Sequence, residues 1–246
     1  MFRSTKGHRP QNPRENANLF AKIVYSFTFP IFRQGLKRAL QVSDVYGVTT
    51  DCQSGLLASA LDAKWDEEKR KRNPKLVFCF FKMFGVTYAC LGIGLLLINT
   101  VTMATFPLLI GKIVKSFQMN SSEGNMHVLC YSLALGSFIL LKTVGFHSYM
   151  FGIERLFIRT QIAFNGLIYR KCLALGTSSS SEVASGKVIT LLTKDVNGLY
   201  FSIHFFHHLW NGVIQIVVLS WMMYAQIGIP ALIAMLFFLL FVPVQG

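Results

Sequence analysis

The sequence predicts an all-α membrane protein, and three observations point to this class. The last 51 residues, Val196–Gly246, contain no Asp, Glu, Lys or Arg. The whole chain is 52% hydrophobic, and its mean hydropathy is +0.46. Basic residues outnumber acidic ones by 24 to 11 and lie in blocks beside the apolar runs. Because about 20 apolar residues cross a bilayer as a helix, the chain is long enough for several crossings.

The first element is a basic segment, residues 1–82, which we predict to be cytoplasmic. It holds 15 of the 24 basic residues, and six more lie between Arg155 and Lys194. Basic blocks that flank apolar spans follow the positive-inside rule for cytoplasmic segments. The location of these basic residues therefore explains the net charge of +13 by the orientation of the chain in a membrane. It argues against nucleic acid as a partner.

An amphipathic helix is predicted within this segment, from Ala17 onward. Its apolar residues recur at steps of three and four, and Pro30 should limit its length. Such a helix fits the membrane interface, although packing against protein is equally compatible with the pattern. The later stretch Trp65–Arg72 predicts a solvated helix with charge pairs four residues apart. The apolar residues of the first helix are Phe20, Ile23, Val24, Phe27 and Ile31.

Four membrane crossings follow. Pro107 should kink the first crossing or mark its exit, and Lys142 is the one charged residue of the second. The charge distribution places the N-terminus in the cytoplasm and the first loop outside, where Asn120-Ser121-Ser122 makes Asn120 a candidate for N-glycosylation. The predicted spans cover residues 86–110, 128–151, 203–225 and 231–246.

No catalytic motif is present in the sequence. It contains no G-x-x-x-x-G-K-[ST], no H-E-x-x-H and no G-x-S-x-G. The five cysteines show no paired spacing, so neither a disulfide framework nor a zinc knuckle is implied. The chain by itself is therefore not expected to bind or hydrolyse a nucleotide, and it needs no metal or other cofactor of its own.

Charged and aromatic residues in the spans are candidates for contact with a transported molecule. Lys142 is costly at mid-span, so with His147 it could face an anionic substrate, or it could snorkel or pair with a carboxylate of another helix. Lys112 at the outer end of the first span could be an interfacial anchor. His204, His207 and His208 share a helix face, where lining a pore or making polar contacts between helices is favoured over a metal site.

Several stretches together resemble one family, the short multidrug-resistance-associated proteins, which are C-subfamily ATP-binding-cassette (ABC) exporters. The resemblance runs from about Asn12 to Gly246, and its most specific part is Ile168–Gln215. The stretches are Asn12–Asn18, Phe29–Gly35, Leu40–Tyr46, Pro107–Lys112, Ile168–Leu175, Ser185–Asn197 and His208–Gln215.

This resemblance implies the first four or so of the six helices in a type-1 ABC transmembrane domain. Nucleotide-binding domains that hold ATP and Mg, and a second transmembrane domain, are expected elsewhere in the full protein. The family exports amphipathic organic anions, conjugates and drugs from the cytosol, which implies the plasma membrane. The alternative is a truncated product without autonomous transport, or an interfering subunit.

The resemblance also assigns residues. A coupling loop that rests on the nucleotide-binding domains would fall within the cytoplasmic region 154–195. Lys112 matches a lysine that lies near the anion-binding cavity in relatives, which favours substrate contact over anchoring. The coupling-loop residues are Thr177, Ser178, Ser179, Ser180, Ser181, Glu182, Val183 and Ala184. The candidates for the substrate pathway are Lys112, Lys142, His147, His204, Phe206, His208 and Trp210.

Overall fold

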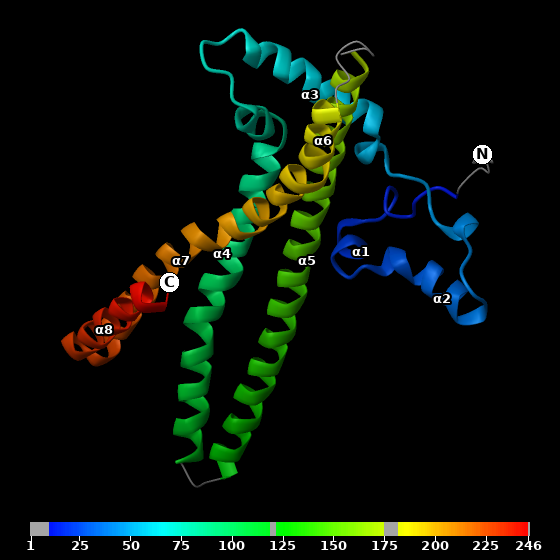
Figure 1. Cartoon of the computed structure of the whole chain (residues 1–246). Helices are drawn as coiled ribbons and strands as arrows, with labels where there is room; N and C mark the ends of the chain where they lie inside the picture. The colour runs from blue at the N-terminus through cyan, green and yellow to red at the C-terminus, as the bar shows by residue number, and fades with distance from the viewer. Residues whose placement is uncertain (1–9, 119–121, 175–181, 246) are drawn as a thin grey trace. The chain divides into compact units, whose positions relative to one another are not determined.

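The computed structural model describes residues 10–118, 122–174 and 182–245, and every element it describes is helical. Four short elements come first: α1 (Leu19–Ile23), α2 (Phe29–Lys37) and the 3₁₀ turns η1 and η2 (Ser26–Thr28, Val42–Asp44). A third 3₁₀ turn, η3 (Thr50–Cys52), leads into α3 (Ser54–Lys69). Figure 1 shows these elements in blue and cyan.

Helices of very different lengths make up most of the rest of the described chain (Figure 1). They are α4 (Leu76–Phe117), α5 (Ser122–Ala174), α6 (Glu182–Thr190), the π-helical turn η5 (Leu191–Asp195), α7 (Val196–Ile227) and α8 (Ile229–Gln245). The chain divides into two compact units. The polar unit comprises Met1–Val86 with Glu154–Tyr200, and the apolar unit comprises Thr87–Ile153 with Phe201–Gly246.

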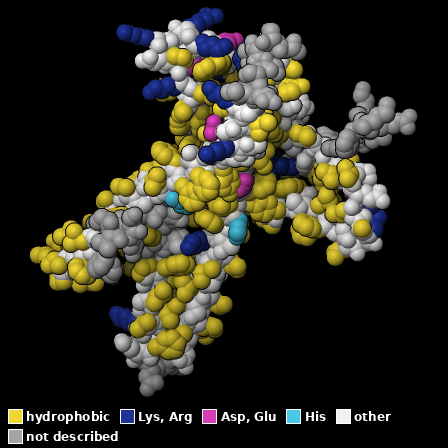
Figure 2. Space-filling view, viewed as in Figure 1, with side chains coloured by type: hydrophobic (Ala, Val, Ile, Leu, Met, Phe, Trp, Pro, Cys, Tyr) yellow, Lys and Arg dark blue, Asp and Glu magenta, His cyan; other side chains and the backbone are white. Residues whose placement is uncertain are grey.

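Two helices of the described chain are long and apolar enough to cross a membrane, Leu76–Phe117 and Gly124–Ala174. Only 11% of the most apolar window of the first and none of that of the second is buried. A core helix of a soluble protein would be mostly buried, so these exposed apolar surfaces fit contact with lipid. Figure 2 shows hydrophobic side chains gathered on the surface of these helices. The four predicted spans fall on α4, α5, α7 and α8, except that Gly246 lies outside the described residues. For α7 and α8 membrane crossing stays a prediction.

In the apolar unit, α4 and α5 pack as an antiparallel pair. Successive contacts are six to eight residues apart in α4 and seven apart in α5. A spacing of about seven residues returns a side chain to the same helix face after two turns, which is the geometry of a coiled-coil seam. Glycines of α5 let the helices approach closely. The contacting pairs are Leu91–Gly152, Ile98–Gly145, Phe106–Phe138 and Lys112–Tyr131.

Two prolines and a glycine shape the helices or their ends. Pro107 lies inside α4, which continues ten residues beyond it to Phe117. Pro30 lies in the first turn of α2, where its missing N–H needs no partner, so it begins a helix instead of ending one. Gly228 is the single residue between α7 and α8. Its φ of 83° is a left-handed backbone conformation that a side chain would strain, so glycine suits this position.

The amphipathic helix predicted from Ala17 is wrong as a single element. Tyr25 adopts a left-handed conformation with φ of 58°, which ends the hydrogen-bond ladder after α1. A 3₁₀ turn follows, and α2 starts a new helix. The spacing of apolar residues is the same on both sides of this break. Such spacing indicates which residues share a helix face, but it does not reveal a single residue with positive φ.

The charged stretch Trp65–Arg72 also differs from the prediction. Its ion pairs join residues three apart, such as Lys71 to Glu68 at 2.6 Å. Glu68 is buried, and Lys82 of α4 approaches its carboxylate to 3.5 Å in addition. The hydrogen bond from Lys71 and the two positive charges hold the pKa of Glu68 below its ordinary value. This carboxylate therefore links α3 to α4 within the polar unit.

Candidate functional site in the apolar unit

A buried histidine joins three helices of the apolar unit. His207 of α7 stacks on Tyr88 of α4, with ring centroids 4.0 Å apart. Tyr149 Oη of α5 lies 3.2 Å from His207 Nδ1, within hydrogen-bond distance. Tyr88 Oη in turn donates to the carbonyl oxygen of Ile203 at 3.0 Å. Polar contacts between helices are costly to break where no water competes, so this aromatic cluster positions α7 against α4 and α5.

The cluster depends on a glycine of α4. An added Cβ at Gly92 would lie 2.8 Å from His207 Nε2 and 3.0 Å from Trp210 Cζ2. The His207 ring cannot easily move away, because Tyr88 covers its face and Tyr149 contacts Nδ1. A hydrogen atom in place of a side chain is therefore what lets α7 approach α4 at this level.

A buried asparagine lies one helical turn beyond His207. Asn211 is 1% exposed, and neither side-chain polar atom has a hydrogen-bond partner among the described residues. Leaving a buried amide unsatisfied costs about 1–3 kcal/mol. Asn211 is therefore a candidate contact for a polar group supplied by another helix or by a transported molecule.

Two lysines of the apolar unit lie near aromatic rings. Lys112 Nζ is 5.5 Å from the ring centroid of Tyr131, and Lys142 Nζ is 5.5 Å from that of Phe106. Neither lysine forms an ion pair within the described part of the chain. By sequence, this unit contains three lysines and five histidines but a single acidic residue, Glu123. Its polar groups therefore favour an anion over a cation.

The remaining candidates divide between the cluster and the surface. Trp210 makes an edge contact with His207 at 6.2 Å, and His208 makes one with Tyr149 at 6.4 Å. His204 is buried, whereas His147 and Phe206 are exposed. The contacts described for this unit join Trp210 and His208 to the cluster and leave the two lysines apart from it.

Sequence reasoning treated His207 only as a member of a histidine group and missed Tyr88, Tyr149 and Asn211 as site residues. Helical spacing places His204 and His207 on one face but does not show which face meets another helix. The polar character of Asn211 in an apolar run was the signal available for it. The described residues contain no group of three or more His, Cys, Asp and Glu placed to hold a metal ion.

An ion cluster in the polar unit ties the segment before α3 to α5. Arg155 Nη2 donates to both carboxylate oxygens of Asp51, and Arg159 Nη1 lies 4.0 Å from the same group. Burial opposes ionisation of Asp51, but the hydrogen bonds from Arg155 and Thr49 and the charges of both arginines outweigh it. The pKa of Asp51 is therefore lowered from its ordinary value.

Two predicted features fall partly or wholly outside the described residues. Asn120 and the loop residues 177–181 have no described placement. Glu182, Val183 and Ala184 open α6, although their side chains are not described. The coupling loop and the glycosylation site both stay predictions.

Comparison with known proteins agrees with this architecture. Residues 89–246 match the family model of the ABC transporter transmembrane region. The chain is 29% identical over 238 residues to the probable multidrug resistance-associated protein lethal(2)03659 of Drosophila melanogaster, covering 96% of this chain and 17% of that protein. It is 29% identical over 243 residues to ATP-binding cassette sub-family C member 4 of Mus musculus, covering 96% and 18%. The chain thus spans less than a fifth of the length of these relatives.

Proposed function

Because the chain belongs to the ABC transporter transmembrane-region family, we propose that it forms part of the substrate pathway of an ATP-driven exporter of amphipathic organic anions. The observation that carries the proposal is the charge of the apolar unit. Lys112 and Lys142 lie there beside aromatic rings, without an ion-pair partner in the described chain. An amphipathic anion needs a cation for its charged group and aromatic surface for the rest.

ATP and Mg belong, in this proposal, to nucleotide-binding domains outside these residues, since the sequence has no phosphate-binding loop. The role of the present residues is to bind the anion in one state of the transporter and to release it in another. An exporter of this kind needs different substrate affinities in its two states. Changes in the spacing of α4, α5 and α7 would alter the surroundings of His207, which contacts Tyr88 of α4 and Tyr149 of α5.

Coupling to the nucleotide-binding domains is the second part of the proposal. The helices α5 and α7 each contribute residues to both units, so movement in one unit can reach the other through continuous backbone. We place the contact tip at residues 177–184, between α5 and α6. The basic residues of the polar unit support a cytoplasmic N-terminus. The plasma membrane is the location that export from the cytosol suggests. Thiol labelling of a Ser180→Cys variant tests this orientation.

The substrate proposal is tested by replacing Lys112 in the full-length transporter. Lys112→Ala should raise the KM for an organic anion by about tenfold to a hundredfold, because a hydrogen bond to a charged group contributes about 1.5–3 kcal/mol. A neutral substrate of similar size should be transported as before. The measurement is ATP-dependent uptake into inside-out vesicles at equal expression.

Lys115→Ala is the matched control, since it removes the same charge from the same helix. Lys115 is exposed and has no ring contact or ion pair among the described residues. Equal loss of anionic and neutral substrates in Lys112→Ala, or the same anion-selective loss in Lys115→Ala, would contradict the assigned role.

A further inference from the structure

The short helix α2 has an apolar stripe beside a basic one. At about 100° of rotation per residue, Phe29, Phe32 and Leu36 share one narrow face, and Arg33 and Lys37 lie on the adjacent one. None of its residues is buried, and Phe32 and Leu36 are 67% and 89% exposed. The helix contains no acidic residue. Such a surface suits the boundary between lipid headgroups and acyl chains.

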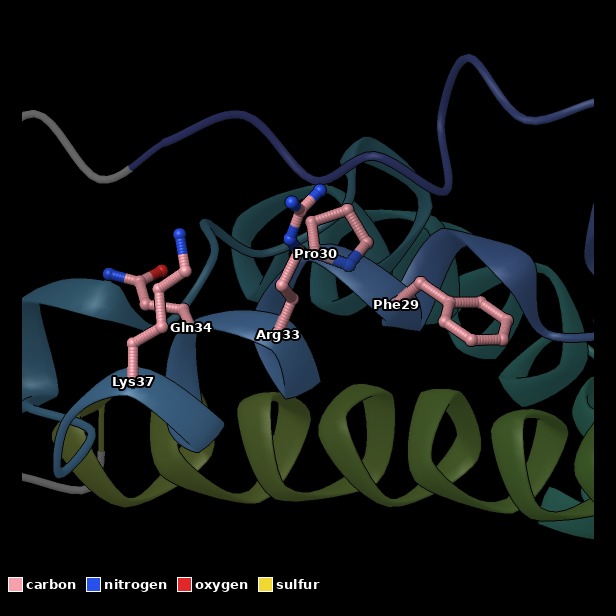
Figure 3. A pocket seen from close by; sticks show the side chains of 5 residues that line it. All are labelled: Phe29, Pro30, Arg33, Gln34 and Lys37. Atoms are coloured by element: carbon pink, nitrogen blue, oxygen red, sulfur yellow. The ribbon is translucent and has the colours of Figure 1, made fainter.

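A hollow of about 740 Å³ lies along the basic side of α2. Phe29, Pro30, Arg33, Gln34 and Lys37 line it. Figure 3 shows that the charged ends of Arg33 and Lys37 point to the same side of the helix, with Pro30 next to Arg33 and Gln34 next to Lys37. The hollow therefore presents two cations one helical turn apart, and Phe29 provides an apolar end.

These two cations differ from their neighbour Arg38. Arg38 donates to both carboxylate oxygens of Asp44 at 2.7 Å, so its charge is compensated within the fold. Gln34 donates to the same carboxylate at 2.9 Å. Arg33 and Lys37 have no ion-pair partner in the described ranges. Because Asp44 pairs with Arg38, the positive charges of Arg33 and Lys37 stay available to an external ligand.

We propose that this hollow binds the headgroup of an anionic phospholipid that carries a phosphomonoester. The arginine fork can donate two hydrogen bonds to one phosphate, and the lysine adds a mobile point charge. Two uncompensated cations match a phosphomonoester, whose charge approaches −2, better than a phosphodiester with a single charge. Phe29, Phe32 and Leu36 then lie against the acyl chains, which a soluble phosphate would lack.

The inference goes beyond transport, because lipid binding requires neither substrate nor ATP. Native mass spectrometry of the full chain in detergent counts bound lipids during titration with short-chain phosphatidylinositol 4-phosphate. Short-chain phosphatidylcholine is the neutral probe, and inositol 1,4-bisphosphate is the headgroup without acyl chains. The test variant is the double substitution Arg33→Gln with Lys37→Gln.

A second double substitution, Arg72→Gln with Lys75→Gln, is the matched control. It removes the same two charges from exposed residues that form no described ion pair. Each basic residue near an anionic lipid contributes about 1 kcal/mol, so the test variant should bind the phosphoinositide about 30-fold more weakly. The control variant should bind it like the unaltered chain, and circular dichroism should show both variants equally helical.

Three results would overturn the proposal. Equal weakening in both variants would show a general charge effect, and binding of phosphatidylcholine as tight as that of the phosphoinositide would show that charge plays no part. Binding of inositol 1,4-bisphosphate as tight as that of the lipid would identify a soluble phosphate as the ligand. Arg33→Lys alone, which keeps the charge but loses the fork, should bind the phosphoinositide more weakly than the unaltered chain and more tightly than the double variant.

Discussion

Replacing Gly92 with alanine should destabilise the apolar unit, although alanine is normally the better helix residue. The added methyl group would lie 2.8 Å from His207 Nε2, 2.9 Å from His207 Cδ2 and 3.0 Å from Trp210 Cζ2. The ring is held by stacking on Tyr88 at 4.0 Å and by Tyr149 at 3.2 Å. The histidine must therefore move, or α4 and α7 must separate.

The magnitude follows from three opposing contributions. Alanine gains about 1 kcal/mol over glycine within a helix. Overpacking costs about 1–3 kcal/mol, and loss of the Tyr149–His207 hydrogen bond costs about 0.5–1.5 kcal/mol. The net effect is a destabilisation of about 2 kcal/mol, which lowers the melting temperature by about 4–8 °C for a chain of this size.

Gly94→Ala is the matched control, because Gly94 lies two residues further along α4 and a Cβ there would meet no atom within 4 Å. This variant should gain only the helix preference and melt about 2–4 °C higher. The assay is thermal unfolding in detergent, followed by circular dichroism. If both variants shift in the same direction by similar amounts, His207 does not lie against Gly92 and the three-helix cluster is wrong.

Two further predictions concern the polar unit. Asp51→Asn should remove part of the pH dependence of stability, because the pKa of Asp51 is lowered in the folded state. The stabilisation by the ionised carboxylate is complete above the unfolded pKa of about 3.9 and is lost as the pH falls through the folded pKa. Because Asp51 is partly exposed, the variant and the unaltered chain should differ at neutral pH by no more than about 1 kcal/mol in free energy of unfolding. The measurement is unfolding of both proteins across the acid range. If both lose stability in the same way as the pH falls, the ion pair with Arg155 does not stabilise the fold. In the full-length transporter, Ser180→Cys should react with a membrane-impermeant thiol reagent in inside-out vesicles and stay unlabelled in intact cells. The native cysteines, five of which lie in this chain, are replaced beforehand so that the introduced thiol is the one that reacts. Labelling in intact cells would then contradict the proposed orientation.

Part of the candidate site was accessible from sequence, because charge in an apolar run is visible without coordinates. Lys142 was singled out for this reason, and His204 and His208 were chosen as polar residues of an apolar helix. Tyr88 and Tyr149 were missed because they lie near the ends of predicted spans, where tyrosines are common. Only their contacts with His207 distinguish them from other aromatic residues.

The amphipathic helix and the charged stretch illustrate the same limit in the polar unit. Periodicity assigned helical structure around Phe20 and Ile31 but did not show the left-handed Tyr25 between them. The charges near Glu68 predicted a solvated surface, whereas that carboxylate is buried and pairs with Lys82, which lies 14 residues further along the chain. In both places the decisive information was a single dihedral angle or a contact between separate helices.

The sequence by itself determined the class of this protein, because long charge-free runs flanked by basic blocks leave few alternatives to helices in a membrane. It also contained the family, through motifs spread over nearly the whole chain. Only the tertiary structure decided which polar residues meet, such as His207 with Tyr149, and where glycine is required for contact, as at Gly92. The physical reason is that composition and period describe each helix alone, whereas contacts depend on how neighbouring helices are rotated and spaced.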